Sequence, residues 1–318
     1  MHHHILPIPR KPYALNWLPE RLIVSHYEKD YGAAVRSLNA LRDRLAAMDP
    51  PSVTPAELRA LKREELSAVG SVILHELYFM NFGGDGKVPA VVTTALERDF
   101  GGVRQWRREF VAAAQSLAGG PGWVVLSYSP YDGRLYNQIA SDHSHAMVGA
   151  APILVLDMYE HAYHLEFGAN AAAYIDVFMR IIDWTVVAER LMGAAGDGQR
   201  RDGEAGKDAL PSISVEELHS VMQSEQQIQV VDARPRNYVS KDPDTMPNAV
   251  WRDPERVDEW SAELSPGAPV FVYCAYGFEV GRSVTTALRE RGFDARYIRG
   301  GLAAWYGAGG TRAVRNRE

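Results

Sequence analysis

The sequence has a single cysteine, Cys274, among its 318 residues, so a disulfide within the chain is excluded. A chain without disulfides fits a reducing compartment, and we expect a cytoplasmic protein. No apolar run reaches the roughly 18 residues that a membrane helix needs, and the N-terminal residues lack the apolar core of a signal peptide. The net charge is −6. Because there is no basic excess, no nucleic acid is expected as a partner. Because there is no long apolar run, no membrane is expected either.

Apolar residues make up 46% of the chain, which is enough for two hydrophobic cores. One segment, GAAGDGQRRDGEAGKDALP at residues 193–211, is instead rich in glycine and charge and has no apolar period. Such a composition is typical of a linker. We therefore predict a first domain over residues 1–195, a linker over 196–210 and a second domain over 211–318.

The apolar periodicity of the first domain predicts helices first and then a small sheet with further helices, which is an α+β arrangement. Helices are expected at residues 19–48, 65–81, 89–100, 103–118 and 171–193. Strands are expected at residues 122–130, 134–141 and 151–157.

The second domain alternates between strand and helix patterns, which favours a small parallel α/β sheet. Strands are expected at residues 227–234, 269–274 and 294–300. Helices are expected at residues 214–223, 281–292 and 301–307.

Residue types that bind metals occur on three separated segments of the first domain. His26 and His75 lie in the two long helical patterns. Asp157 ends the apolar run ILVLD, and His161 lies in the turn after it. Three imidazoles with one carboxylate suit iron or manganese in a site with an open position. Taken singly, a helical histidine is more often a core or surface residue than a ligand.

Together, the segments HYEKDYGAAVRSLN, VILHELYFMN, GGPGW and DMYEHAYHLEFG resemble the iron/manganese superoxide dismutase family over about residues 15–192. The resemblance implies a helical hairpin followed by an α/β metal domain. It also implies one iron or manganese ion per subunit, held by His26, His75, Asp157, His161 and a solvent molecule. Superoxide or another small anion would be the substrate.

The resemblance also implies an aromatic environment for the metal. Trp123 falls where the family packs a tryptophan beside the ion, and Tyr78 and Phe79 fall in its aromatic shell. The alternative for these residues is plain core packing.

Three positions around the expected site depart from the family pattern. Asp30 stands where the family has a histidine, and Ala34 stands where it has a gateway tyrosine. The glutamine (sometimes histidine) that bonds the solvent is expected near Ser71 or in IASDHSH. The second location offers Asp142, with His143 beside it.

Two further residues are expected at a subunit interface. Glu160 matches a family glutamate that bonds the last ligand histidine of the partner, which implies a homodimer or a dimer of dimers. His164 and Asp30 replace a tyrosine and a histidine that meet across this interface in the family. We hypothesise that they form an acid–imidazole pair between subunits. The alternative is that the two positions changed independently.

Cys274 ends the apolar strand pattern PVFVYC, shortly before a helix pattern, and backbone N–H groups in such a place stabilise a thiolate. VVDAR, VYCAYG…GRS and RYIRGGLAAW resemble the rhodanese family over about residues 212–305. The resemblance implies a persulfide on Cys274 and a sulfur donor. The loop departs from the family because Glu279 and Val280 fill its second half and Arg282 comes late. A carboxylate facing the thiol would raise the thiol pKa and discourage an anionic donor.

Within the same domain, Asp232 and Arg234 match the family's second-strand motif. We expect them to hold the sheet rather than to react.

Three functions stay open on the sequence alone. The first is a superoxide dismutase with a rhodanese-like domain. The second is a sulfurtransferase or other redox enzyme whose metal domain has altered or lost dismutase activity. The third is a dimeric metal-binding scaffold with an interaction domain.

Overall fold

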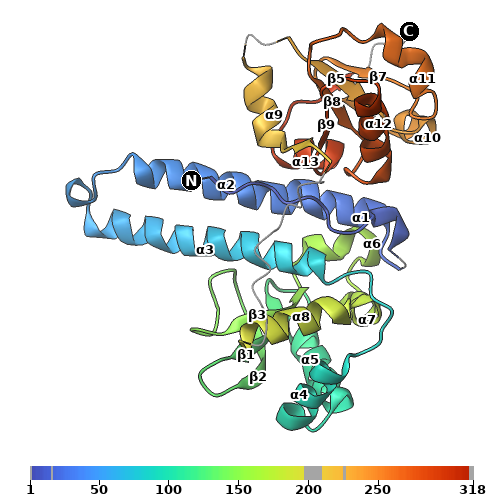
Figure 1. Cartoon of the computed structure of the whole chain (residues 1–318). Helices are drawn as coiled ribbons and strands as arrows, with labels where there is room; N and C mark the ends of the chain where they lie inside the picture. The colour runs from blue at the N-terminus through green and yellow to red at the C-terminus, as the bar shows by residue number, and fades with distance from the viewer. Residues whose placement is uncertain (1, 16, 197–209, 225–226, 315–318) are drawn as a thin grey trace. The chain divides into compact units, whose positions relative to one another are not determined.

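The computed structural model describes residues 2–15, 17–196, 210–224 and 227–314. These residues form two compact units (Figure 1). The first unit contains most of residues 12–196. The second contains residues 210–314 together with the short segments His3–Lys11 and Tyr27–Arg36. Apart from its two end residues, the predicted linker at 196–210 lies outside the described residues.

The N-terminal helices run nearly as the periodicity predicts. The pattern at residues 19–48 forms α1 (Glu20–Ser25), a π-helix (His26–Tyr31) and α2 (Gly32–Ala46). Short 3₁₀ turns precede and follow them at Pro12–Ala14 and Pro50–Ser52. A π-helical turn inside an α-helix is rare and often marks a functional site.

Helix α3 (Pro55–Met80) begins ten residues before the predicted start at residue 65. Proline suits the first helical turn because the N–H that it lacks would have no partner there. Thr54 caps the helix, since its side chain accepts a hydrogen bond of 3.2 Å from the Glu57 amide. The apolar period alone missed this exposed first part of the helix.

The sheet of the first unit has three antiparallel strands in the order β2-β1-β3. The strands are β1 (Trp123–Ser129), β2 (Arg134–Ala140) and β3 (Ala151–Asp157). Two helices before the sheet are α4 (Ala90–Phe100) and α5 (Val103–Ser116). In the central strand, Trp123 pairs with Asp157 of β3. This register sets the tryptophan beside the carboxylate.

The last helical segment of the first unit is two helices, not the single predicted helix at residues 171–193. They are α7 (Ala171–Ile181) and α8 (Trp184–Ala194). The chain turns at Ile182, which forms a bridge with Phe82. Asp183 then caps α8 by accepting a hydrogen bond of 3.1 Å from the Thr185 amide. The apolar period continues through this break, so it gave no sign of it.

The second unit is built on a five-stranded sheet in the order β4-β9-β8-β5-β7, with every pair parallel. The strands are β4 (Ser212–Ile213), β5 (Gln229–Asp232), β7 (Ala249–Trp251), β8 (Val270–Tyr273) and β9 (Ala295–Ile298). A separate antiparallel pair joins β6 (Asp244–Thr245) to β10 (Ala313–Val314).

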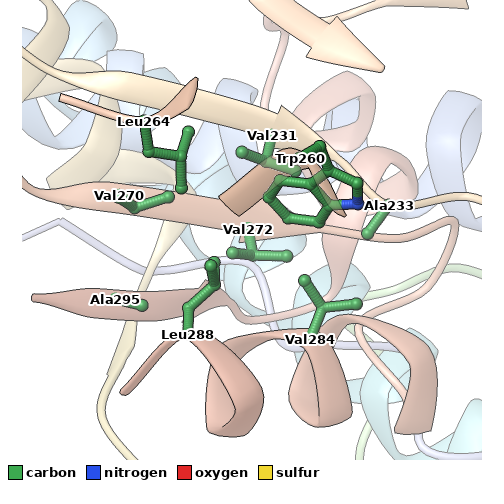
Figure 2. Packing of buried hydrophobic residues seen from close by; sticks show 9 residues of the cluster. All are labelled: Val231, Ala233, Trp260, Leu264, Val270, Val272, Val284, Leu288 and Ala295. Atoms are coloured by element: carbon green, nitrogen blue, oxygen red, sulfur yellow. The ribbon is translucent and has the colours of Figure 1, made fainter. Parts of the chain in front are cut away.

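Helices accompany this sheet. They are α9 (Val215–Met222), α10 (Arg236–Lys241), α11 (Val257–Trp260), α12 (Glu279–Glu290) and α13 (Gly301–Gly307), with a 3₁₀ turn at Ser261–Glu263. Figure 2 shows the core in which Val284 and Leu288 of α12 and Trp260 of α11 meet apolar side chains of the strands. The predicted α+β fold with a small parallel second domain is confirmed. Among the described residues, no helix has the length and apolar character needed to cross a membrane.

Candidate metal centre

The four candidate ligands come from four different elements and converge on one place. His26 begins the π-helix, His75 lies in α3, Asp157 ends β3, and His161 lies in the 3₁₀ turn Glu160–Ala162. One ligating atom of each residue lies within 4.8 Å of those of the others. The fold therefore brings the sequence segments that carry these residues close together.

One carboxylate oxygen, Asp157 Oδ2, is common to the cluster. It lies 3.1 Å from His161 Nε2, 3.3 Å from His26 Nε2 and 3.8 Å from His75 Nε2. An ion about 2.1 Å from each ligand requires ligand atoms about 3 to 4 Å apart. These distances, and a donor set of three imidazoles and one carboxylate, fit an iron or manganese ion.

Asp157 is fully buried, and its other oxygen is held by the backbone. Oδ1 accepts a hydrogen bond of 2.8 Å from the Tyr159 amide, which leaves Oδ2 for the cluster. Burial opposes ionisation, but hydrogen bonds from His161 and His26 outweigh it and hold the pKa of Asp157 below its usual range. The carboxylate therefore stays anionic, as a metal ligand must be.

His75 is held as a neutral ring. Its Nδ1–H donates a hydrogen bond of 2.7 Å to the backbone carbonyl of Ser71, one turn earlier in α3. Burial, reinforced by the neighbouring His26, lowers the pKa of His75 to about 3. The Ser71 carbonyl thus fixes the tautomer that presents Nε2 to Asp157.

Access from solvent is uneven across the cluster. The side chain of His161 is 25% exposed, whereas those of His26 and Asp157 are fully buried. A small ligand would therefore reach the cluster beside His161.

The expected aromatic residues surround the cluster. Trp123 lies edge-on to His75 with ring centroids 5.1 Å apart, and Tyr78 and Phe79 lie 5.1 and 5.0 Å from the His26 ring. Tyr174 donates a hydrogen bond of 2.8 Å to the Asp157 carbonyl and is 2.9 Å from the Tyr78 hydroxyl. The aromatic groups thus both pack against the ligands and fix the backbone of Asp157.

The structure places His143, not Asp142, beside the candidate ligands. The Asp142 carboxylate accepts hydrogen bonds from the backbone and hydroxyl of Ser144 and is half exposed. His143 instead accepts a hydrogen bond of 3.0 Å from Trp123 Nε1, and its ring centroid is 6.1 Å from that of His75. The Asp142 carboxylate caps its own loop. The group beside the candidate ligands is therefore the imidazole of His143 and not the expected acid.

Tyr159 is a site residue that the sequence reasoning missed. Its ring stacks on His161 with centroids 5.4 Å apart and planes within 8°. Burial and the charge of Asp157 raise the pKa of its hydroxyl to about 12. The signal was available, since Tyr159 lies between two candidate ligands in the DMYEH segment.

Of the positions expected at a subunit interface, two are accessible to a partner subunit. Glu160 and His164 are exposed, and His164 begins the short helix α6 (His164–Phe167). Asp30 is half-buried at the end of the π-helix, and Ala34 follows in α2. The pairing of Asp30 with His164 concerns two subunits and stays a prediction.

In the second unit, Cys274 follows β8 and is 6% exposed. A Cβ on Gly281 would lie 3.4 Å from the Cys274 sulfur, so the first turn of α12 packs directly on the thiol. The carbonyl of Cys274 accepts a hydrogen bond of 3.0 Å from Leu302 of α13. Two helix starts therefore hold the loop that carries the thiol.

The charged residues of this loop are engaged elsewhere. Glu279 is exposed and forms an ion pair with Lys11. The Arg282 guanidinium lies over the Tyr297 ring, 4.9 Å from its centroid, and bonds the Tyr297 hydroxyl. The Glu279 carboxylate is thus paired with the ammonium group of Lys11.

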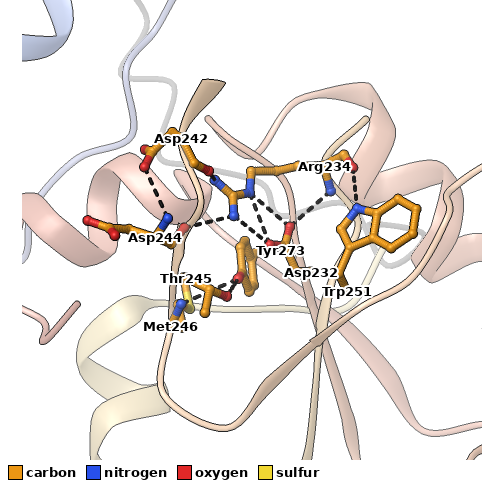
Figure 3. A network of polar contacts seen from close by, with 8 residues as sticks. All are labelled: Asp232, Arg234, Asp242, Asp244, Thr245, Met246, Trp251 and Tyr273. Carbon is orange, nitrogen blue, oxygen red and sulfur yellow. Dashed lines mark hydrogen bonds and ion pairs between the residues drawn. The ribbon is translucent and has the colours of Figure 1, made fainter. Parts of the chain in front are cut away.

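Asp232 and Arg234 form a buried ion pair in the same domain, as Figure 3 shows. Arg234 also donates to the backbone carbonyls of Asp242 (3.1 Å) and Asp244 (2.8 Å), and its own carbonyl accepts from Trp251 Nε1. A charge satisfied on every side in this way organises the chain around it. This geometry supports the structural role expected for the pair.

Comparisons with known proteins agree with this geometry. The family described as "Iron/manganese superoxide dismutases, C-terminal domain" has a sequence model that matches residues 89–190. The model of the family described as "Rhodanese-like domain" matches residues 214–308. An iron superoxide dismutase of Cupriavidus metallidurans is 50% identical over 197 residues, which cover 62% of this chain and 100% of that protein. An iron superoxide dismutase of Aquifex pyrophilus is 33% identical over 57% of this chain and 87% of its own length.

A manganese-named relative is more distant. The protein named superoxide dismutase [Mn] 2 of Haloferax volcanii is 30% identical over 60% of this chain and 96% of its own length. The chain thus matches nearly the whole of each relative with about three fifths of its own length, and the rhodanese-like match comes after the dismutase-like one. The chain belongs to the iron/manganese superoxide dismutase family and carries a rhodanese-like domain after its dismutase-like domain.

Proposed function

We propose that the first domain removes superoxide by dismutation at one metal ion held by His26, His75, Asp157 and His161. The observation that carries this proposal is the convergence of three imidazole nitrogens within 3.8 Å of one buried carboxylate oxygen. When bound, the metal would take one electron from a first superoxide, releasing O₂, and return it to a second, which takes up two protons to form H₂O₂.

The residues of the chain supply the conditions for this reaction. Asp157 contributes the one negative charge of the ligand set and is kept ionised by its hydrogen bonds. His75 stays neutral, held by the Ser71 carbonyl. His26, His75 and Asp157 are at most 2% exposed, so a small anion can enter beside His161, whose side chain is 25% exposed.

We infer that the metal is iron. Support comes from the relative at 50% identity, which is named an iron enzyme, whereas the manganese-named relative is 30% identical. Protein produced with iron and manganese both supplied should contain about one iron per chain by mass spectrometry. Equal or dominant manganese would contradict this inference.

The test of the function itself compares metal-loaded and metal-free full-length protein in stopped-flow measurements of superoxide decay. We expect fast decay in proportion to bound metal, and no acceleration without it. Protein with a full complement of metal that leaves the spontaneous decay rate unchanged would contradict the proposal.

A second activity, sulfur transfer through a persulfide on Cys274, is supported by the packing of the first turn of α12 against the thiol. A helix start stabilises an anionic sulfur. After exposure to a sulfur donor, the wild-type protein should release about one cyanide-labile sulfur per chain, and Cys274→Ser should release none. Equal release from both proteins would contradict this assignment.

We further propose a homodimer formed through the surface that carries Glu160 and His164. Both side chains are exposed in the single chain although they flank a candidate ligand, His161. Their outward position is what an interface residue requires.

A further inference from the structure

A hollow of about 500 Å³ opens in the rhodanese-like part, at the carboxyl ends of neighbouring parallel strands. Its walls come from three segments that each follow a strand. They are residues 235–237 after β5, residues 253–255 after β7, and Val280 and Ser283 of α12, which follows β8. Ligands of open parallel α/β sheets bind at this edge of the sheet. The hollow therefore has the position of a ligand site.

The hollow lies beside the loop that carries the thiol. Strand β5 pairs with β8, and the register sets Asp232 opposite Tyr273, the residue before Cys274. The segments that follow these two strands therefore leave the sheet side by side. In the first turn of α12, Gly281 packs on the Cys274 sulfur, and its neighbour Val280 lines the hollow. The same helical turn thus borders both the thiol and the hollow.

The charged groups that line the hollow are negative in balance. They are the guanidinium of Arg236 and the carboxylates of Asp253 and Glu255. The guanidinium is already engaged, because its Nε donates a hydrogen bond of 3.1 Å to Asp253 and it lies over the Trp251 ring, 4.9 Å from the centroid. Among the described residues, none pairs with the Glu255 carboxylate. One negative charge in the hollow is therefore left without a counter-ion from the chain.

The cations nearest in sequence to the thiol loop are also engaged outside the hollow. Arg282 lies over the Tyr297 ring and donates a hydrogen bond of 3.1 Å to its hydroxyl. Residues 274–278, CAYGF, have no charged side chain. An anionic sulfur donor would thus meet carboxylates in the hollow and no unpaired cation, and like charges repel it.

We propose that this hollow binds a cationic sulfur donor, an aminothiol persulfide, so that Cys274 takes sulfur from such donors in preference to anionic ones. The inference rests on the proposed sulfur transfer through Cys274 and names its substrate class. The Cys274 thiolate attacks the outer sulfur of the donor R–S–SH, and a new S–S bond forms. The S–S bond of the donor breaks, R–S⁻ leaves with the electron pair, and the outer sulfur keeps its proton. Glu255 attracts the ammonium group on R.

The test uses the full-length protein and two donors of the same chemistry and opposite charge. Cysteamine persulfide is the cationic donor, and mercaptopropionate persulfide is the anionic one. Cyanide-labile sulfur on the protein is measured against time, with Cys274→Ser as the blank. Glu255→Gln removes the unpaired carboxylate of the hollow. Glu290→Gln is the matched control, because Glu290 is an exposed carboxylate at the other end of α12.

We expect the wild type to react about tenfold faster with the cationic donor. The reason is that replacing a cation by an anion beside one negative charge changes the interaction by about twice the value of an exposed ion pair. Glu255→Gln should reduce this preference to about twofold, and Glu290→Gln should keep it. Equal rates with the two donors, or an unchanged preference in Glu255→Gln, would overturn this inference alone. No labile sulfur from either donor would overturn the proposed sulfur transfer and this inference with it.

Discussion

At the scale of single residues, the candidate metal centre depends on Asp157. Its two oxygens have separate tasks, since Oδ1 accepts from the Tyr159 amide and Oδ2 faces three imidazoles. A fully buried carboxylate is costly unless its charge is compensated. In the loaded protein, a cation in the cluster would provide that compensation.

Asp157→Asn removes the one anionic ligand while preserving shape. We expect the bound metal, measured by mass spectrometry after dialysis, to fall at least about tenfold. Asp142→Asn is the matched control, because Asp142 is half exposed and bonds Ser144, and it should keep the wild-type metal content. Equal metal retention by both variants would argue against the assigned ligand set.

The neutral state of His75 predicts a pH dependence of stability in the metal-free protein. Its pKa is about 3 in the folded chain against 6.5 for an ordinary histidine. Below pH 6.5 the unfolded chain takes up a proton that folded His75 does not accept, so the free energy of unfolding decreases toward about pH 3. The slope from this residue is up to about 1.4 kcal/mol per pH unit.

Asp157, whose pKa is depressed below the ordinary 3.8, adds to the loss once the pH falls toward that value, because the unfolded chain then takes up a proton that folded Asp157 does not. Denaturant unfolding of wild type and His75→Gln between pH 7 and pH 4 checks the prediction, and the variant should show the shallower slope. Parallel pH profiles would show that His75 is not held neutral in the folded protein.

The residues of the site differ in how well sequence predicts them. The four candidate ligands lie in long, specific motifs, and the fold brings all four together. The position beside the ligands was uncertain by one residue, because Asp142 and His143 lie in an irregular loop without a period to fix which side chain points inward. Tyr159 was missed because stacking between distant segments depends on ring planes, which only three-dimensional packing defines.

At the scale of elements, the close approach of α3 to the loop at residues 141–150 is set by one glycine. Gly70→Ala would place a Cβ 1.8 Å from a backbone oxygen that cannot rotate away. We expect a loss of about 1–3 kcal/mol in the free energy of unfolding. Gly193→Ala in α8 is the control, because nothing lies within 4 Å of its added Cβ.

The control substitution should stabilise the protein by up to about 1 kcal/mol, since alanine favours a helix. Denaturant unfolding of the two variants measures both effects. A Gly70→Ala protein as stable as the control would mean that α3 and the loop can separate without cost.

Elements with a clear apolar period were predicted well, and the failures have local causes. The strands of the first unit match within one or two residues because their apolar runs end at polar or turn residues. The early start of α3 was missed because its first turns are exposed and carry little apolar period. The break at Ile182 was missed because a bridge to Phe82, distant in sequence, ends α7.

At the scale of the whole molecule, we expect a dimer in which His164 of one subunit meets Asp30 of the other. Asp30→Asn and His164→Gln should each raise the dimer dissociation constant about tenfold, because each removes the charge of one member of the acid–imidazole pair. Sedimentation equilibrium measures the constant. The double variant should be no weaker than either single variant, whereas fully additive losses would show that the two residues do not interact.

The dismutase-like and rhodanese-like parts carry separate reactive groups on separate folds. Dismutation by the first part is tested most directly by the rate of superoxide decay, per bound metal ion, in stopped-flow experiments on the full-length protein and on Asp157→Asn. We predict rapid decay for the wild type, with the rate proportional to its metal, and decay at the spontaneous rate for the variant. A wild-type protein that holds about one metal ion per chain and still leaves superoxide to decay spontaneously would contradict the claim.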